Sequence, residues 1–168
     1  MQTTAPMPPN EVVAIRTATV ADASDVAHMV APLLEEIMAA IGNAAFCFDL
    51  AETEARLSTY IEQAKYFVFV ARDGEGTACG FIALHESHAL YAEGAFGTIP
   101  ELFVHPSWRS TTVGSQLIAA ARQLAIDKGW RRLEVTTPPL PQFQRTLDFY
   151  ERQGFSLSGG RKLKTDLA

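Results

Sequence analysis

Residues 101–116, with the sequence ELFVHPSWRSTTVGSQ, contain the step from a strand to a helix on which the rest of the predicted fold depends. In the first five residues, Leu102 and Val104 face one side of the chain, whereas Glu101, Phe103 and His105 face the other side. This alternation predicts a strand. From Thr112 onward the apolar residues recur at spacings of three and four, which predicts an amphipathic helix that ends at Gly129.

A loop of small hydroxylated residues, led by a cation and followed by a glycine, joins this strand to this helix. The first N–H groups of a helix have no partner within it, and with the positive end of the helix dipole they form a site for anions, above all phosphate. The hydroxyl groups can either cap the helix or donate to a bound pyrophosphate, and the residues alone leave both open. The candidate phosphate-binding residues are Arg109, Ser110, Thr111, Thr112, Val113, Gly114 and Ser115.

This loop resembles the acetyl-CoA loop of the GNAT superfamily of N-acetyltransferases, where Arg/Gln-x-x-Gly-x-Gly/Ala lies between a strand and a helix. Arg109 and Gly114 occupy the first and last positions of that pattern, and Thr112 stands where the middle glycine usually is. Residues 147–155, LDFYERQGF, are similar to the family's second signature, a helix that carries Phe-Tyr and ends in Gly-Phe. The resemblance extends over roughly residues 13–163.

The expected fold is of the α/β (α+β) class, with a mixed, mostly antiparallel twisted sheet of about six to seven strands and helices on both faces. Pro32 interrupts the first helical run, which is therefore either two pieces or one kinked helix. An irregular connection is expected at 88–97. We expect strands at 12–16, 67–71, 80–85, 101–105, 132–136, 155–157 and 161–164, and helices at 21–41, 51–63, 112–129 and 142–153.

Pro100 lies directly before the strand at 101–105. Because a proline cannot donate to a sheet ladder, a β-bulge is plausible here. The resemblance implies such a bulge, which separates this strand from the one at 132–136 so that the pantetheine of acetyl-CoA lies in the gap. It implies cofactor contacts at Leu102, Phe103, Val104 and Phe149.

Acetyl transfer to an amine needs a base for an ammonium of pKa about 10, a donor to the thioester oxygen and an acid for the departing thiolate. Glu101 is the candidate base, directly or through water, because burial in an apolar strand would raise its pKa; otherwise it is an exposed strand glutamate. Tyr150 is the candidate acid, since the resemblance places it beside the cofactor sulfur; otherwise it packs in the core. A backbone N–H of Phe103 or its neighbour would meet the oxyanion.

The connection at 44–49 carries two aromatic side chains, Phe46 and Phe48, that either pack in the core or contact the acceptor substrate. At the end of the strand at 80–85, His85 and His88 lie three apart and face different sides, and no third ligand is apparent, so no metal site is predicted.

Length and composition bound the remaining possibilities. The 168 residues, 48% hydrophobic and 20% charged, fit one domain at 11–168 after a disordered tail at 1–10. The net charge of −5, without a basic cluster, disfavours nucleic acid as a partner. No apolar segment suggests a membrane span or a signal peptide, so we expect a cytoplasmic protein. A homodimer is common among proteins of this resemblance.

The sequence thus predicts an N-acetyltransferase that uses acetyl-CoA to acetylate a primary amine by direct attack in a ternary complex. Two other classes stay open. A non-catalytic acetyl-CoA-binding or sensing domain is favoured by Thr112 and by Phe143, which stands where many relatives have an asparagine. A purely structural dimerisation domain would not respond to the cofactor at all.

Overall fold

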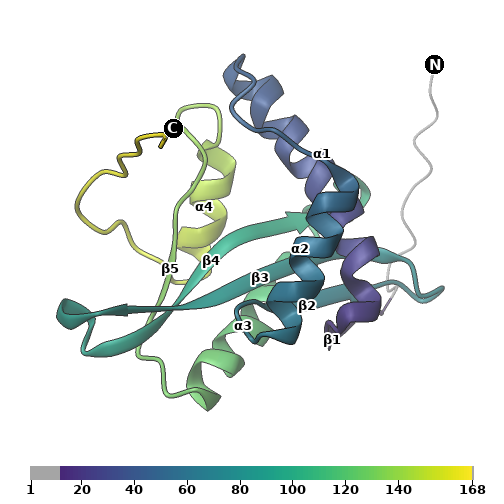
Figure 1. The fold of residues 1–168 in the computed structure, drawn as a ribbon, viewed down its shortest axis with the longest axis horizontal. Coiled ribbons are helices and arrows are strands. Elements are labelled where there is room, and N and C mark those ends of the chain that lie inside the picture. The colour runs from purple at the N-terminus through teal and green to yellow at the C-terminus, as the bar shows by residue number, and fades with distance from the viewer. Residues whose placement is uncertain (1–11, 168) are drawn as a thin grey trace.

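A five-stranded sheet in the order β1-β2-β3-β4-β5 forms the centre of the computed structural model, which describes residues 12–167. Neighbouring strands are antiparallel except β4 and β5, which are parallel. The helices α1 and α2 cover one face, and α3 and α4 pack on the other (Figure 1). The elements are β1 (Ala14–Thr17), α1 (Ala23–Ile41), α2 (Leu50–Glu62), β2 (Phe67–Arg72), β3 (Ala78–Ala89), β4 (Gly94–Val104), α3 (Val113–Asp127), β5 (Leu133–Val135) and α4 (Gln144–Arg152).

The expected class of fold is confirmed, but the expected six to seven strands are too many. The predicted closing hairpin at 155–157 and 161–164 contains no strand. Phe155 packs against the core, but Leu157 and Leu163 are exposed, so the segment buries no continuous face that would stabilise a hairpin. The predicted tail at 1–10 lies outside the described residues.

Helix α1 runs without a break through Pro32, so the interpretation as two separate pieces is wrong. The ring of Pro32 lies on the exposed side, where water can satisfy the carbonyl that loses its helical partner. Upstream of the helix, the amide of Thr19 donates to Asp22 Oδ2 at 2.8 Å, which is half of a capping box. Gly42, with φ 67°, ends the helix in the left-handed region.

The irregular connection predicted at 88–97 is instead the end of a long hairpin. Strand β3 continues to Ala89 and β4 starts at Gly94, with a short 3-10 turn at Leu90–Ala92 between them. This arm extends beyond the helical layers (Figure 1). Apart from Phe96, which is buried, its strand residues beyond His85 are small or polar, so the apolar alternation that would have predicted a strand is missing.

The bulge expected at Pro100 is present. Ala83 of β3 pairs with Glu101 of β4, and His85 of β3 pairs with Thr98 of β4. Between these two pairs β3 has one residue and β4 has two, which is a bulge. The pairing between β4 and β5 ends at Ile99, one residue before the proline. Beyond that point the two strands diverge (Figure 1), which leaves the last five residues of β4 without a partner on the β5 side.

Two hydrophobic clusters lie on the two faces of the sheet. Phe103 belongs to the cluster under α1 and α2, whereas Leu102 and Val104 pack against the cluster under α3 and α4. The alternation predicted for this strand is therefore confirmed. Glu101, which has the same parity as Phe103, projects toward α1 and α2.

Gly97 lies where β3, β4 and β5 are paired, and a methyl group there would have no room. A Cβ would lie 2.6 Å from Leu133 Cδ2 and from the Trp130 ring. That ring is fixed, because it is buried and its Nε1 donates to Glu86 Oε2 at 2.6 Å. We expect Gly97→Ala to lower the free energy of unfolding by about 1–3 kcal/mol, measured by urea denaturation.

Gly159 provides the matched control, since nothing lies within 4 Å of a Cβ there. Gly159→Ala should change the free energy of unfolding by less than about 1 kcal/mol. Equal stability of the two variants would show that the junction of β3, β4 and β5 can absorb the added volume.

Candidate active site

Glu101 lies on β4 immediately after the bulge, at the point where β4 separates from β5. Burial raises the pKa of its carboxyl group to about 7, and a hydrogen bond from the Tyr66 hydroxyl acts in the opposite direction. That bond is long, at 3.5 Å between the hydroxyl and Oε1. The carboxylate thus lies in an apolar environment with one weak partner, and it gains or loses its proton near neutral pH.

A pocket of about 200 Å³ lies between Glu101 and the two helices above it. We call it the acceptor pocket. Apolar residues of α1, α2 and β3 form most of its surface: Val26, Val30, Leu34, Leu57, Phe81 and Ala83. The only charged side chains among the described residues that line it are Glu101, at the sheet, and Arg56, on α2.

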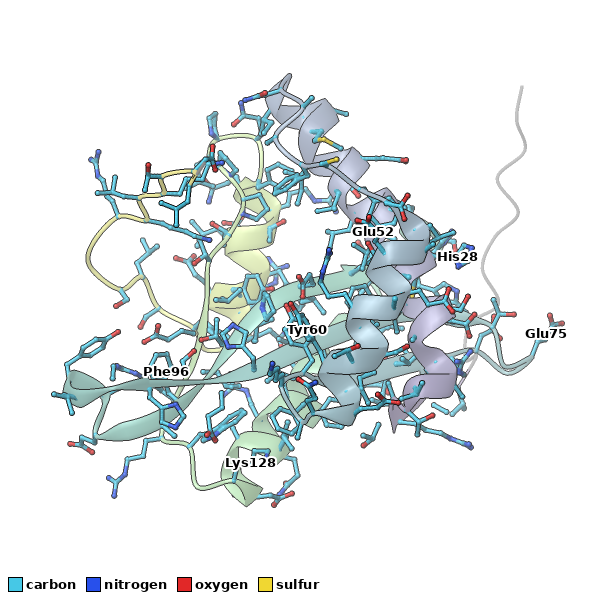
Figure 2. All side chains as sticks on the ribbon, in the orientation of Figure 1. His28, Glu52, Tyr60, Glu75, Phe96 and Lys128 are labelled. Atoms are coloured by element: carbon cyan, nitrogen blue, oxygen red, sulfur yellow. The ribbon has the colours of Figure 1, made fainter. Side chains whose placement is uncertain are left out.

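A second and more open pocket, of about 540 Å³, adjoins the first. Tyr60 and Tyr66 line both pockets, and Figure 2 labels Tyr60 where α2 lies over the sheet. The two tyrosine rings are 5.1 Å apart, and Tyr66 also stacks on His85 with a centroid distance of 6.1 Å. Burial, with the nearby charge of Glu101, raises the pKa of Tyr66 well above its usual range. Tyr66 therefore remains a hydrogen-bond donor at neutral pH.

The two aromatic residues predicted to contact the acceptor lie in different places. Phe48 lines the acceptor pocket, together with its neighbour Cys47. Phe46 is 43% exposed and does not line it. Sequence reasoning missed Arg56, Tyr60 and Tyr66, because they line the same pocket as Glu101 only through the way α2 lies over the sheet.

The guanidinium of Arg109, the first residue of the predicted phosphate loop, is bound to helix α1. It forms a bidentate ion pair with Glu36, with nitrogen–oxygen distances of 2.8 and 2.7 Å. Its Nε donates to the carbonyl of Val104 at 2.9 Å, and it lies over the ring of Phe103. Arg109 therefore ties the loop to α1 and β4, and Glu36 balances its charge.

The backbone of the loop adopts a left-handed conformation at Ser110, with φ 61°. At Thr112, where the GNAT pattern usually has glycine, φ is −84° and ψ is −2°, so a side chain at that position causes no backbone strain. The Thr112 hydroxyl accepts a hydrogen bond from Gln116 Nε2 at 2.8 Å.

The first turn of α3 is only partly capped. The Thr111 hydroxyl donates to the carbonyl of Trp108 and accepts from the amide of Val113 at 3.3 Å. Within residues 12–167, the amides of Gly114 and Ser115 have no hydrogen-bond acceptor. They therefore remain available to an anion at the positive end of this 15-residue helix.

Gly114 also sets the distance between α3 and α4. A Cβ there would lie 3.1 Å from the ring of Phe149, which packs directly against the glycine. The Phe149 ring in turn makes an edge contact with Tyr150, at a centroid distance of 5.4 Å. The predicted cofactor residue and the predicted acid are thereby held beside the phosphate loop.

Tyr150 is 5% exposed, and burial raises the pKa of its hydroxyl well above the usual range. In the described part of the chain, every side-chain nitrogen or oxygen that is fully buried has a hydrogen-bond partner, whereas the Tyr150 hydroxyl has none. The hydroxyl group must therefore retain some contact with solvent. A ligand can reach it without breaking an existing bond.

Backbone amides on β4 point into the gap between β4 and β5. The amide of His105 donates to the carbonyl of Cys79 in β3, and alternation along the strand directs the amide of Phe103 to β3 as well. The amides of Leu102 and Val104 therefore point away from β3. The sequence suggested the amide of Phe103 or of its neighbour as the donor to the oxyanion. Because the Phe103 amide points to β3, only a neighbouring amide is available to donate to an oxyanion.

Among residues 12–167, no three His, Cys, Asp or Glu side chains are grouped so that they could hold a metal ion. None of the helices in this range combines the length and apolar character needed to cross a bilayer.

Solved structures with this fold include several acetyltransferases. An aminoglycoside N-acetyltransferase in complex with CoA is 19% identical, with a TM-score of 0.77, and the match covers 96% of this chain and 99% of that one. An aminoglycoside acetyltransferase from an uncultured soil metagenomic sample is 20% identical, with a TM-score of 0.73 and coverages of 93% and 97%. A ribosomal-protein-alanine N-acetyltransferase from Brucella melitensis biovar Abortus 2308 is 17% identical, with a TM-score of 0.71 and coverages of 92% and 99%.

Comparison with the curated proteins gives no match. A family model described as an acetyltransferase (GNAT) domain matches residues 64–157, which include β2 to α4 and therefore the bulge, the phosphate loop and Tyr150. This match covers more than half of the chain. The chain belongs to the GNAT acetyltransferase family.

Proposed function

We propose that this protein transfers the acetyl group of acetyl-CoA to a primary amine, by direct attack of the amine in a ternary complex. One observation carries the proposal: a carboxyl group with a pKa of about 7, Glu101, borders both the acceptor pocket and the opening between β4 and β5. Such a group accepts a proton at neutral pH, which an ordinary strand glutamate does poorly.

The acyl donor would occupy the gap between the strands. The free amides of Gly114 and Ser115 suit its pyrophosphate, with Ser110 and the two threonines after it in the same loop. Its pantetheine would lie along Leu102, Phe103 and Val104. Arg109 supports this arrangement by holding the loop against α1, since its charge is already balanced by Glu36.

Three steps follow from these positions. Glu101 takes a proton from the ammonium of the acceptor, directly or through a water molecule, and the free amine attacks the thioester carbonyl. The amide of Leu102 or Val104 donates to the developing oxyanion. Tyr150 donates a proton to the departing thiolate. The proposal includes a cytoplasmic location and, as is common among similar proteins, a homodimer.

The aminoglycosides named for two of the structural neighbours are poor candidates for the acceptor. They carry several ammonium groups, whereas Glu101 is the only carboxylate among the described residues that line the acceptor pocket. The cation of Arg56 in the same pocket repels further positive charge. The acceptor should therefore carry one ammonium group.

Binding of the acyl donor can be tested before the acceptor is known. A ligand that binds only the native state raises its stability by about 2.7 kcal/mol at a hundred times the dissociation constant. We expect acetyl-CoA to raise Tm in a saturable manner and to release thiol when a suitable amine is added, whereas ATP and dephospho-CoA shift Tm less.

Two results would contradict the proposal. No shift with acetyl-CoA in a folded sample would show that the chain has no donor site, as expected of a structural domain. A saturable shift without thiol release from any primary amine would identify the non-catalytic sensing domain, which the pairing of Arg109 with Glu36 and the presence of Thr112 favour.

A further inference from the structure

Arg56 is the one charged residue of the acceptor pocket to which the proposed chemistry assigns no role. Its only ion-pair partner among the described residues is Glu52, one helical turn earlier, at 4.0 Å. The two side chains are 57% and 74% exposed, so this contact contributes little and leaves most of the guanidinium donors free.

A free guanidinium at the edge of an apolar pocket prefers a carboxylate as its binding partner. Its planar fork of N–H donors matches the two oxygens of a carboxylate, and such charge-assisted pairs are among the stronger hydrogen bonds in proteins. An ammonium group at that position would be repelled. The pocket thus presents the Glu101 carboxylate, which accepts hydrogen bonds, to one end of a ligand. It presents the Arg56 guanidinium, which donates hydrogen bonds to a carboxylate, to another end.

The rest of the acceptor pocket favours a small apolar body. Its volume of about 200 Å³ is below the range of about 300–1,000 Å³ for drug-sized ligands. Val26, Val30 and Leu34 of α1 line one side of it, and Leu57 and Phe81 add to the apolar surface. A ligand with one ammonium, one carboxylate and a hydrophobic side chain complements this lining.

We infer that the acceptor is a free amino acid with an apolar side chain. The carboxylate of this amino acid pairs with Arg56, its ammonium faces Glu101, and its side chain packs against α1. This inference rests on the acetyl transfer proposed above. A bond forms between the nitrogen and the acetyl carbon, and the bond from that carbon to sulfur breaks. Of the two protons that the ammonium loses, one ends on the CoA thiol and the other goes to solvent.

The decisive measurement compares acceptors that differ only in the carboxylate. Phenylalanine and leucine would be compared with phenethylamine and isopentylamine, their decarboxylated counterparts, by kcat/KM from thiol release. We expect the wild-type protein to prefer each amino acid by about tenfold or more, since a charged hydrogen bond contributes about 1.5–3 kcal/mol. Arg56→Gln should reduce this preference to about one, because it lowers kcat/KM for the amino acids and not for the plain amines, which the Arg56 cation only repels.

Arg131→Gln is the matched control, because Arg131 is an exposed arginine paired with Glu93 on the far arm of the sheet. It should keep the wild-type preference. A merely structural role of Arg56 would lower kcat/KM for both acceptors of a pair equally, and that result would overturn the inference.

The test also separates this inference from the proposed function. Acetylation of the plain amines without any gain from a carboxylate would overturn the amino-acid inference and leave acetyl transfer in place. Absence of both acetyl-CoA binding and thiol release with all four acceptors would overturn both. Acetylation of phenylalanine amide as fast as phenylalanine would also contradict the assigned role of Arg56.

Discussion

Replacement of Glu101 by glutamine is expected to lower kcat for acetyl transfer by about 100-fold, which is the lower end of the usual contribution of a general base. Glutamine has nearly the same shape and can still accept a hydrogen bond from Tyr66, but it cannot take a proton from the acceptor. The binding of acetyl-CoA should be unchanged, because the phosphate loop is built from residues 109–115. Steady-state kinetics and the acetyl-CoA-dependent shift in Tm measure the two effects separately.

The pH dependence gives a second measure of the same group. Because the pKa of Glu101 is raised to about 7, the carboxyl group is protonated and inactive as a base at lower pH, and it becomes active as the pH rises through 7. Below that point log(kcat/KM) should increase by about one per pH unit, and above it the profile should level off until the ammonium of the acceptor loses its own proton. The inflection near pH 7 should be absent in Glu101→Gln.

Glu75→Gln is a suitable control, since Glu75 lies in the exposed turn between β2 and β3, at the edge of the molecule in Figure 2. This variant should keep both the wild-type rate and the inflection. An unchanged rate in Glu101→Gln would show that Glu101 is not the base.

The parts of the fold that the sequence predicts correctly are those governed by local rules. Proline cannot donate to a ladder, and the bulge does occur at Pro100. Glycine favours a left-handed backbone, and α1 does end at Gly42. The apolar alternation of residues 101–104 depends only on the two faces of a strand, and the two hydrophobic clusters divide these residues as expected.

The incorrect or missing predictions depend on contacts between distant segments. The ion pair of Arg109 with Glu36 joins residues 73 positions apart, and no local pattern indicates it. Arg56 and Tyr66 line the same pocket as Glu101 because α2 lies over that part of the sheet. The arm of β3 and β4 is held mainly by pairing between the two strands, and Phe96 is the one large apolar residue that it buries in the strands, so its sequence has no apolar period.

Replacement of Tyr150 by phenylalanine is expected to lower kcat by about 100-fold while the affinity for acetyl-CoA stays nearly constant. Burial raises the pKa of the phenol, so it is protonated at neutral pH but is a weaker acid than a free phenol, and it can donate only to a thiolate held within hydrogen-bond reach. A thiolate that forms in the same buried gap is also poorly solvated, which raises the pKa of the thiol above its usual value of about 8.5 and favours the transfer.

The variant should fold normally. In residues 12–167 the Tyr150 hydroxyl makes no hydrogen bond, so its removal breaks none, and the ring contacts with Phe149 and Phe155 remain. Tyr91→Phe is the matched control, since Tyr91 is 77% exposed at the tip of the β3–β4 arm and should have no effect on kcat. If Tyr150→Phe keeps the wild-type kcat, Tyr150 only packs in the core and the thiolate takes its proton from water. If the variant loses acetyl-CoA binding to the same extent as kcat, the hydroxyl positions the donor and is not the acid.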